Sequence, residues 1–241
     1  MAKDTFKVLT FHGRPASGKS ETIDFLKKLT KEERIEKYHI GEIIDIDDFP
    51  MLWAWFEEDA ILEDLGHERL HTTEDGYFKY IYQWDVLVRR LCLEYDKIIA
   101  DLENVEDYTI IIEFSRGKQH GGYERAYQHM TEDVLKDAAL YYVKVDYEES
   151  MRKNRLRKNP RKLHSLLEHS VEEDKLKKLY RNDDFDEFSE GAEDYLDVKG
   201  IKLPFGVLDN QEDLTSEPDE SLAIELEKVF GKLWENYKRL H

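Results

Sequence analysis

Short apolar runs alternate along the chain with longer segments in which apolar residues recur every three or four positions. The short runs are typical of buried strands, and the longer periodic segments are typical of amphipathic helices. Strands are predicted at residues 6–11, 38–46, 108–114, 140–145 and 201–208. Helices are predicted at residues 21–29, 51–65, 77–105, 123–137, 148–158, 171–180 and 220–240. This alternation of strands and helices predicts an α/β fold.

Three further expectations concern single elements. Because Pro204 has no N–H to donate, the strand at residues 201–208 is predicted at an edge of the sheet. The charged residues 31–37 are predicted to end the first helix. Of Trp53, Trp55 and Phe56, at least two are expected in the core, and the alternative is that these rings line an acceptor pocket.

The composition favours a single domain with a substantial core. Of the 241 residues, 40% are hydrophobic and 12% aromatic, and we expect residues 147–200 to form a lid or insert within the domain. No apolar run approaches the ~20 residues of a membrane span. Residues 1–4 lead directly into the first strand and leave no room for a signal peptide. A single cysteine, Cys92, predicted to be buried, fits a reducing compartment, so a cytoplasmic location is expected.

The formal net charge of −18 is unevenly distributed. Residues 151–162 carry seven Lys and Arg and no acid, whereas residues 182–198 carry eight acids and no base. An acidic chain argues against nucleic acid as a partner, because nucleic-acid-binding proteins usually present a basic face. The compact basic cluster suits a small anionic ligand instead. The oligomeric state is left open, a homodimer included.

Residues 13–20 have the sequence G-R-P-A-S-G-K-S, which matches the phosphate-binding loop G-x-x-x-x-G-K-[ST]. The motif requires a strand before it and a helix after it, and both are predicted. Gly13 and Gly18 allow the backbone to turn its N–H groups toward a polyphosphate. Lys19 would reach the β- and γ-phosphates, and the Ser20 hydroxyl would bind Mg²⁺. The residues predicted to hold ATP here are Gly13, Arg14, Pro15, Ala16, Ser17, Gly18, Lys19, Ser20 and Glu21.

Acidic residues follow two of the predicted strands. Asp47 and Asp48 come after residues 38–46, and Glu113 lies near the end of residues 108–114. Ligands of open α/β sheets bind outside the carboxyl ends of the strands. Asp48 or Asp47 is therefore a candidate for the base that accepts the proton of an attacking hydroxyl. Glu113 is a candidate Mg²⁺ ligand, directly or through water. The alternative for the aspartates is that they cap a helix that begins before Pro50.

Three arginines are candidates for stabilising the charge of a transferring phosphoryl group. Arg116 follows Glu113 closely. Because a buried carboxylate without a partner is costly, Glu113 is expected to pair with Arg116 or with another cation. Arg152 and Arg155 share one face of the helix predicted at residues 148–158, while Arg157 is expected to point elsewhere unless the helix breaks near Pro160. The alternative is a solvated basic helix that pairs with the acidic segment downstream.

Residues 67–71 (H-E-R-L-H) match the zinc-protease pattern H-E-x-x-H. That motif requires the middle of a helix and a third ligand. Gly66 directly before His67, and Thr72, Thr73 and residues 75–76 after it, indicate a helix end instead. A surface helix end or a contact with the acceptor is favoured over zinc hydrolysis.

Taken in order, these motifs resemble those of the nucleoside and nucleoside-monophosphate kinases, which belong to the P-loop NTPases. Residues 46–49 (I-D-D-F) are similar to the Asp-Asp-Phe turn of uridine-kinase-like enzymes. Residues 113–116 (E-F-S-R) are similar to the Glu-Arg element of deoxynucleoside kinases, with two extra residues between the acid and the arginine. Residues 208–210 (L-D-N) resemble a last-strand turn that lies near the adenine, which makes Asn210 a candidate donor contact.

The resemblance implies a three-layer α/β sandwich with a parallel five-stranded sheet in the order 2-3-1-4-5 and a helical lid. It also implies an ATP–Mg²⁺-dependent phosphotransferase whose acceptor is a nucleoside, a nucleotide or a related metabolite. The resemblance does not extend to residues 51–105 and 163–200, so the acceptor is not identified. Two alternatives stay open: a slow ATPase that binds a protein partner through its acidic segment, and a polynucleotide-end kinase.

Overall fold

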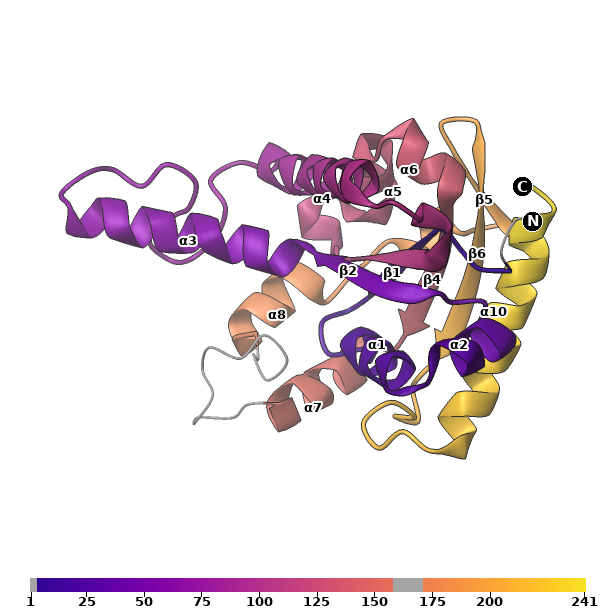
Figure 1. The fold of residues 1–241 in the computed structure, drawn as a ribbon. Helices are drawn as coiled ribbons and strands as arrows, with labels where there is room; N and C mark the ends of the chain where they lie inside the picture. Colours follow the sequence, from indigo (N-terminus) through magenta and orange to yellow (C-terminus); the bar gives the residue numbers. More distant parts are fainter. Residues whose placement is uncertain (1–3, 158–170) are drawn as a thin grey trace.

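The computed structural model describes residues 4–157 and 171–241. Within these residues, six strands form one sheet in the order β2-β3-β1-β4-β6-β5 (Figure 1). The strands are β1 (Val8–Gly13), β2 (Glu42–Asp47), β3 (Tyr108–Glu113), β4 (Ala138–Lys144), β5 (Tyr195–Val198) and β6 (Ile201–Asp209). All neighbouring strands are parallel except β5, which pairs antiparallel with β6. The predicted α/β fold with a mostly parallel sheet is confirmed.

Helices cover both faces of the sheet (Figure 1). The α-helices are α1 (Lys19–Lys28), α2 (Lys31–Tyr38), α3 (Asp48–Asp64), α4 (Tyr82–Asp101), α5 (Gly122–His129), α6 (Glu132–Asp137), α7 (Tyr147–Arg157), α8 (Glu173–Tyr180), α9 (Phe185–Phe188) and α10 (Glu220–Lys238). Two short 3₁₀-helices are η1 (Val105–Asp107) and η2 (Lys118–His120). Helices α4, α5 and α6 contribute to the core on one face, and α1, α2 and α10 to the core on the other. No helix in the described ranges is both long and apolar enough to span a membrane.

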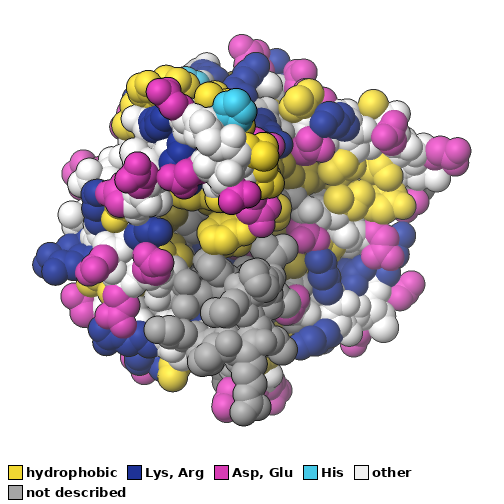
Figure 2. All heavy atoms as spheres, turned by 90° about the vertical axis from the view of Figure 1, so that its left-hand side faces the viewer, with side chains coloured by type: hydrophobic (Ala, Val, Ile, Leu, Met, Phe, Trp, Pro, Cys, Tyr) yellow, Lys and Arg dark blue, Asp and Glu magenta, His cyan; other side chains and the backbone are white. Residues whose placement is uncertain are grey.

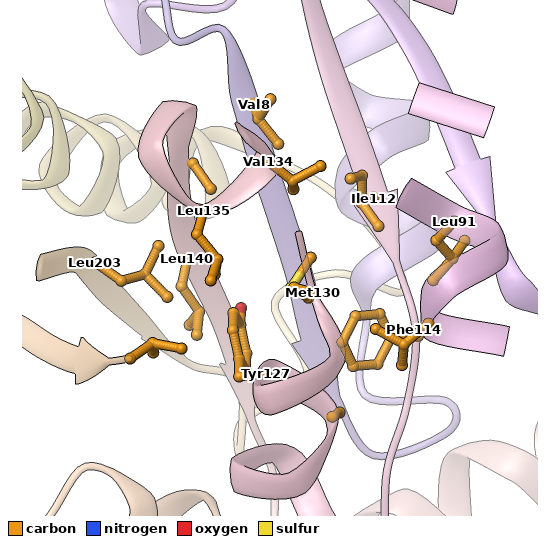
Figure 3. Packing of buried hydrophobic residues seen from close by; sticks show 14 of the residues in the cluster. Val8, Leu91, Ile112, Phe114, Tyr127, Met130, Val134, Leu135, Leu140 and Leu203 are labelled. Carbon is orange, nitrogen blue, oxygen red and sulfur yellow. The ribbon is translucent and has the colours of Figure 1, made fainter. Parts of the chain in front are cut away.

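Two apolar clusters, one on each face, hold the helices to the sheet. Figure 3 shows Met130 and Val134, from the α5–α6 segment, pointing toward Val8 and Ile112 of the sheet. On the other face, Tyr141 of β4 stacks on Phe230 of α10 with ring centroids 4.9 Å apart. Each fully buried large apolar side chain contributes about 1.5–3 kcal/mol. The two clusters therefore fix the strand ends from which the loops of the candidate site emerge.

The sheet differs from the prediction at one edge. The predicted strand at residues 201–208 is β6, but it is not an edge strand, because β5 covers it. Pro204 is tolerated because the pairing of β6 with β4 begins only at Phe205, whereas Ile201 to Pro204 pair with β5. The sheet accordingly has six strands rather than five. The five parallel strands keep the expected order, with β6 as the fifth of them.

Three helix boundaries also differ from the sequence prediction. Residues 31–38 form a separate helix, α2, because Thr30 and Glu33 make a capping box at its start. The predicted helix at residues 77–105 begins only at Tyr82. The predicted helix at residues 123–137 is split into α5 and α6, because Met130 is extended and buried between them.

Helix α3 and the segment that follows it project from the body of the molecule (Figure 1). We call residues 48–81 the arm. Asp59 of α3 is fully buried and its carboxylate accepts hydrogen bonds from the backbone N–H groups of Leu70, His71 and Thr72, at 2.5–2.9 Å for the closest oxygen of each. These bonds hold the returning segment against α3. The arm forms one wall of the cavity described next.

Candidate active site

At two positions in the loop between β1 and α1, the backbone has a positive φ that glycine adopts more readily than other residues. Gly13 has φ +146° and Gly18 has φ +116°. A Cβ on Gly13 would lie 2.5 Å from the carbonyl oxygen of Val143, and a Cβ on Gly18 would overlap Thr215 Oγ1. Both glycines are therefore required by conformation and by space. The loop leads into the first turn of α1, where helix N–H groups favour an anion.

Lys19 lies within this loop and is almost fully buried. Its Nζ donates hydrogen bonds to the carbonyl oxygens of Arg14 (3.1 Å) and Gly13 (3.3 Å) and to Ser115 Oγ (3.0 Å). Burial lowers the pKa of Lys19, and the nearby carboxylate of Glu113 opposes that shift. The ammonium group is thus held over the loop, in the place from which it can reach a bound phosphate.

Ser20 and Glu113 face each other across the start of α1. Ser20 Oγ donates to Glu113 Oε1 at 3.2 Å, and Lys19 Nζ lies 3.8 Å from the same oxygen. Burial raises the pKa of Glu113, and Lys19 opposes that rise. The predicted cationic partner of Glu113 is therefore Lys19, while Arg116 pairs elsewhere. A hydroxyl and a carboxylate together fit Mg²⁺, which prefers oxygen ligands.

Asp47 lies opposite Glu113 in the pairing of β2 with β3. Its Oδ1 accepts a hydrogen bond from Phe49 N at 2.9 Å, so it caps α3 as the alternative interpretation predicted. Asp47 also lines the cavity, so the two interpretations do not exclude each other. Burial, with Glu113 and Asp48 close by, raises the pKa of Asp47 to about 8.

Asp48 and Arg116 form a buried ion pair. Arg116 Nη1 lies 2.6 Å from Asp48 Oδ2, and the two residues are 2% and 6% exposed, respectively. Burial raises the pKa of Asp48, and Arg116 opposes the rise. The guanidinium lies over the rings of Trp84 (5.0 Å) and Phe114 (4.8 Å). Its Nε and Nη2 have no hydrogen-bond partner within the described residues.

All of these groups except the glycines line a single cavity of about 880 Å³. Its remaining wall comes from the arm, α8 and the end of α7. The side chains that line it are those of Pro15, Ala16, Ser17, Lys19, Ser20, Asp47, Asp48, Phe49, Leu52, Trp53, Phe56, Tyr77, Phe78, Tyr80, Ile81, Trp84, Glu113, Phe114, Ser115, Arg116, Gln119, His120, Asn154, Arg157, Val171, Glu172, Lys175, Lys178, Leu179 and Tyr180, with Gly76. Figure 2 shows the face from which α3 projects, where apolar side chains gather near the centre between acidic and basic ones.

The basic residues of α7 are arranged differently from the prediction. Arg152 pairs with Glu149 and Asp213, and Arg155 pairs with Glu173; neither lines the cavity. Arg157, expected to point elsewhere, does line it and pairs with Glu21. Lys153, a further member of the basic cluster, pairs with Asp213. The other three members, Lys158, Arg161 and Lys162, lie outside the described residues.

Neither Arg14, which belongs to the phosphate loop, nor Asn210 lines the cavity. Arg14 pairs with Asp183 at 2.6 Å and donates to the carbonyl oxygen of Val145 at 2.9 Å. Asn210 Nδ2 donates to the carbonyl oxygen of Ser17 at 2.7 Å. These bonds fix the loop from behind, so both side chains have a supporting position in this structure.

The acidic segment at residues 182–198 is partly structural. Asp183 pairs with Arg14, and Asp184 accepts hydrogen bonds from the first N–H groups of α5, at Tyr123 and Glu124. A carboxylate at a helix N-terminus is stabilised by the helix dipole. Two of the eight acids are thus used in holding α5 and the phosphate loop.

The H-E-x-x-H pattern does not form a helix. His67, Glu68 and His71 lie in the irregular segment after α3, and the His71 ring stacks on Trp55 with centroids 5.0 Å apart. The two histidines therefore lack the one-turn helical spacing on which the zinc interpretation depends. Across the described residues, no group of three or more His, Cys, Asp and Glu is arranged to hold a metal ion.

Several lining residues were not predicted from the sequence. Ser115 follows Glu113 by two positions, and alternation along a strand would have placed both side chains on the same side. His120 and Trp84, whose rings stack 3.8 Å apart, come from segments distant in sequence, and no local signal joins them. Of Trp53, Trp55 and Phe56, at least two were expected in the core, but none of them is buried; Trp53 and Phe56 line the cavity, as the alternative interpretation predicted.

Comparisons with known proteins add little to this geometry. No protein-family model matches the chain, and no curated protein matches it either. Among solved structures, it is similar to one described as "Crystal structure of APE1195", with 17% sequence identity, 99% of this chain and 97% of that chain covered, and a TM-score of 0.40. Similarity at that TM-score supports no argument about fold or function. The fold therefore rests on the strand order and pairing themselves.

Proposed function

We propose that the protein is a phosphotransferase that moves the γ-phosphoryl group of ATP, with Mg²⁺, to a small-molecule acceptor. The acceptor class is a nucleoside, a nucleotide or a related metabolite. One observation carries the proposal: the phosphate loop and the Asp47–Asp48 pair line the same cavity, with Glu113 between them. A donor and an acceptor hydroxyl bound in that cavity would meet, which is the main requirement of phosphoryl transfer.

The donor phosphates would be held by the loop N–H groups and by Lys19. Ser20 and Glu113 would hold Mg²⁺, which supplies charge neutralisation on the phosphates when bound. A second cavity of about 230 Å³, lined by Glu21, Lys153, Leu156, Arg157, Ser216 and Glu217, is available for the nucleoside of the donor. Arg157 lines both cavities, which supports a continuous donor site.

The acceptor hydroxyl would be oriented by Asp47 and Asp48, one of which accepts its proton. The raised pKa of Asp47, about 8, suits a group that takes a proton near neutral pH. Arg116 would keep Asp48 in place and offer its two unpaired nitrogens to oxygens in the cavity. Because Arg152 and Arg155 are paired elsewhere, Arg157 is the α7 arginine we propose near the transferring phosphoryl group.

The proposal is tested with Lys19→Ala, and with Lys28→Ala as the matched control, since Lys28 is exposed at the end of the same helix. We expect Lys19→Ala to lower ATP consumption by roughly 100-fold or more, because it removes a cation from the developing charge. Lys28→Ala should match the wild type, and both variants should remain folded at the assay temperature, which thermal unfolding measures.

Two results would contradict the proposed function. One is ATP consumption by Lys19→Ala equal to that of the wild type. The other is wild-type ATP consumption that proceeds at the same rate with and without any acceptor from a panel of nucleosides, nucleotides and sugars. The second result would favour a slow ATPase.

A further inference from the structure

One wall of the main cavity, where α8 faces the arm, carries two lysines. Lys175 and Lys178 come from α8, and Gly76 and Tyr77 face them from the arm. Lys178 Nζ lies 3.5 Å from the centroid of the Tyr77 ring. Lys175 Nζ is so close to Gly76 that a Cβ there would lie 2.6 Å from it. The two elements thus meet at these cations, on a wall separate from the phosphate loop.

The charge of this wall contrasts with the net charge of −18 of the chain. Lys175 pairs with Glu172 at 3.3 Å, but the Glu172 side chain is 76% exposed. Lys178 has no carboxylate within 4 Å among residues 4–157 and 171–241. Asp75 interacts electrostatically with both lysines, and its pKa is lowered mainly by the Thr73 hydroxyl and also by the two lysines. Lys178 in particular keeps its hydrogen-bond donors available to a ligand.

Arg116 gives an independent indication of the same ligand chemistry. It is 2% exposed and lines this cavity, yet its Nε and Nη2 have no hydrogen-bond partner in the described part of the chain. Unpaired buried donors cost free energy, which a ligand oxygen would offset. Two walls of the cavity therefore offer N–H donors and positive charge to oxygen atoms.

Aromatic rings line the space between these donors. Phe56 and Phe78 lie with centroids 5.5 Å apart, and Trp84 packs edge-on against Phe78 at 4.8 Å. Such rings favour a flat, apolar group over a sugar chain or a flexible aliphatic one.

We propose that the acceptor is a flat-ringed molecule that carries a phosphate or carboxylate group, and that Lys175 and Lys178 bind that anionic group. This inference rests on the proposed function in one respect, because it identifies the molecule bound in this cavity as the phosphoryl acceptor. Charge-assisted hydrogen bonds from ammonium groups to such anions are stronger than neutral ones. Lysines at this wall would then select anionic acceptors over their neutral counterparts.

The test is calorimetric binding to the full chain, with a non-hydrolysable ATP analogue and Mg²⁺ present to fill the donor site. The probes are matched pairs: adenosine with adenosine monophosphate, uridine with uridine monophosphate, and indole-3-acetamide with indole-3-acetate. We expect at least one anionic probe to bind about tenfold more tightly than its neutral partner, a difference of about 1.4 kcal/mol. Phosphate pairs that discriminate while the indole pair does not identify a phosphate group, and the reverse identifies a carboxylate.

The Lys175→Ala/Lys178→Ala variant should lose this discrimination, whereas Lys177→Ala should keep it. Lys177 lies on the same helix, is exposed and does not line the cavity, so it controls for net charge. Equal binding of neutral and anionic probes, no binding of any anionic probe, or the same loss in Lys177→Ala would overturn the inference. If anionic probes bind as expected but no phosphate is transferred to them, the proposed function fails and the anion site stands.

Discussion

The ion pair of Asp48 with Arg116 is the most deeply buried charge interaction of the candidate site. Removing one partner of a buried pair leaves the other charge uncompensated, at a cost of about 3–5 kcal/mol. We therefore expect Arg116→Met to lower the free energy of unfolding by about 3 kcal/mol, measured by urea denaturation. The double variant Asp48→Asn/Arg116→Met should recover part of that loss, because the uncompensated carboxylate is gone. A double variant whose loss equals the sum of the two single losses would contradict a direct interaction.

At the residue scale, the sequence identified the groups that belong to a local motif but not their partners. Lys19, Ser20 and Glu113 were predicted from the loop pattern and from a strand that ends in an acid. The partner of Asp48 could not be predicted, because it depends on how residues after β3 fold back over β2. The positions of Arg152 and Arg155 were likewise set by distant acids, Asp213 and Glu173. Helical spacing says which residues share a face, but not which surface that face meets.

The arm depends on one carboxylate for its shape. Asp59 accepts hydrogen bonds from three backbone N–H groups and from the Thr72 hydroxyl, and these bonds lower its pKa from 3.8 to about 2 despite its burial. A carboxyl group whose folded pKa is depressed adds stability above its unfolded pKa and loses that stability as the pH falls toward its folded pKa. The shift corresponds to about 2 kcal/mol.

We accordingly expect Asp59→Asn to lower the free energy of unfolding by about 2 kcal/mol at pH 7. The difference from the wild type should shrink as the pH falls from about 4 to about 2, because the wild-type carboxylate is then protonated. Asp64→Asn is the matched control, since Asp64 is exposed at the end of the same helix. Denaturant unfolding at several pH values measures both variants. A difference that stays constant from pH 7 to pH 2 would refute the carboxylate role.

At the element scale, the five parallel strands were predicted because each contains an apolar run, and the runs of β1, β3 and β4 are almost completely buried. The arm was predicted poorly because its order comes from hydrogen bonds between residues eleven to thirteen positions apart, which have no periodicity. Residues 77–81 were included in the helix predicted at residues 77–105, yet Phe78 forms a β-bridge with Thr72. Strand β5 was missed because its four residues are too few for a clear alternation.

The whole molecule places two kinds of ligand chemistry at the carboxyl edge of one parallel sheet. The phosphate loop follows β1, Asp47 ends β2 and Glu113 ends β3, and these three strands are adjacent in the sheet. The order of the parallel strands was expected from the resemblance, so this meeting of groups was also expected. The walls of the cavity were not expected from the sequence, because they come from the arm and α8, whose packing depends on tertiary contacts.

Binding of donor and metal should therefore stabilise the molecule as a whole in two separable steps. A non-hydrolysable ATP analogue at 100 times its Kd adds about 2.7 kcal/mol, which for a chain of this size raises the Tm by roughly 5–10 °C. We expect Mg²⁺ to increase this rise in the wild type, and EDTA to remove the increase.

Glu113→Gln should keep the rise produced by the analogue alone but lose the Mg²⁺-dependent part, because a neutral amide is a poorer Mg²⁺ ligand than a carboxylate. Glu106→Gln, at an exposed site in η1, is the control. If the Mg²⁺-dependent rise in Tm is the same in Glu113→Gln as in the wild type, Glu113 is not a Mg²⁺ ligand. If the ATP analogue raises the Tm of Lys19→Ala as much as that of the wild type, the phosphate loop does not bind the donor.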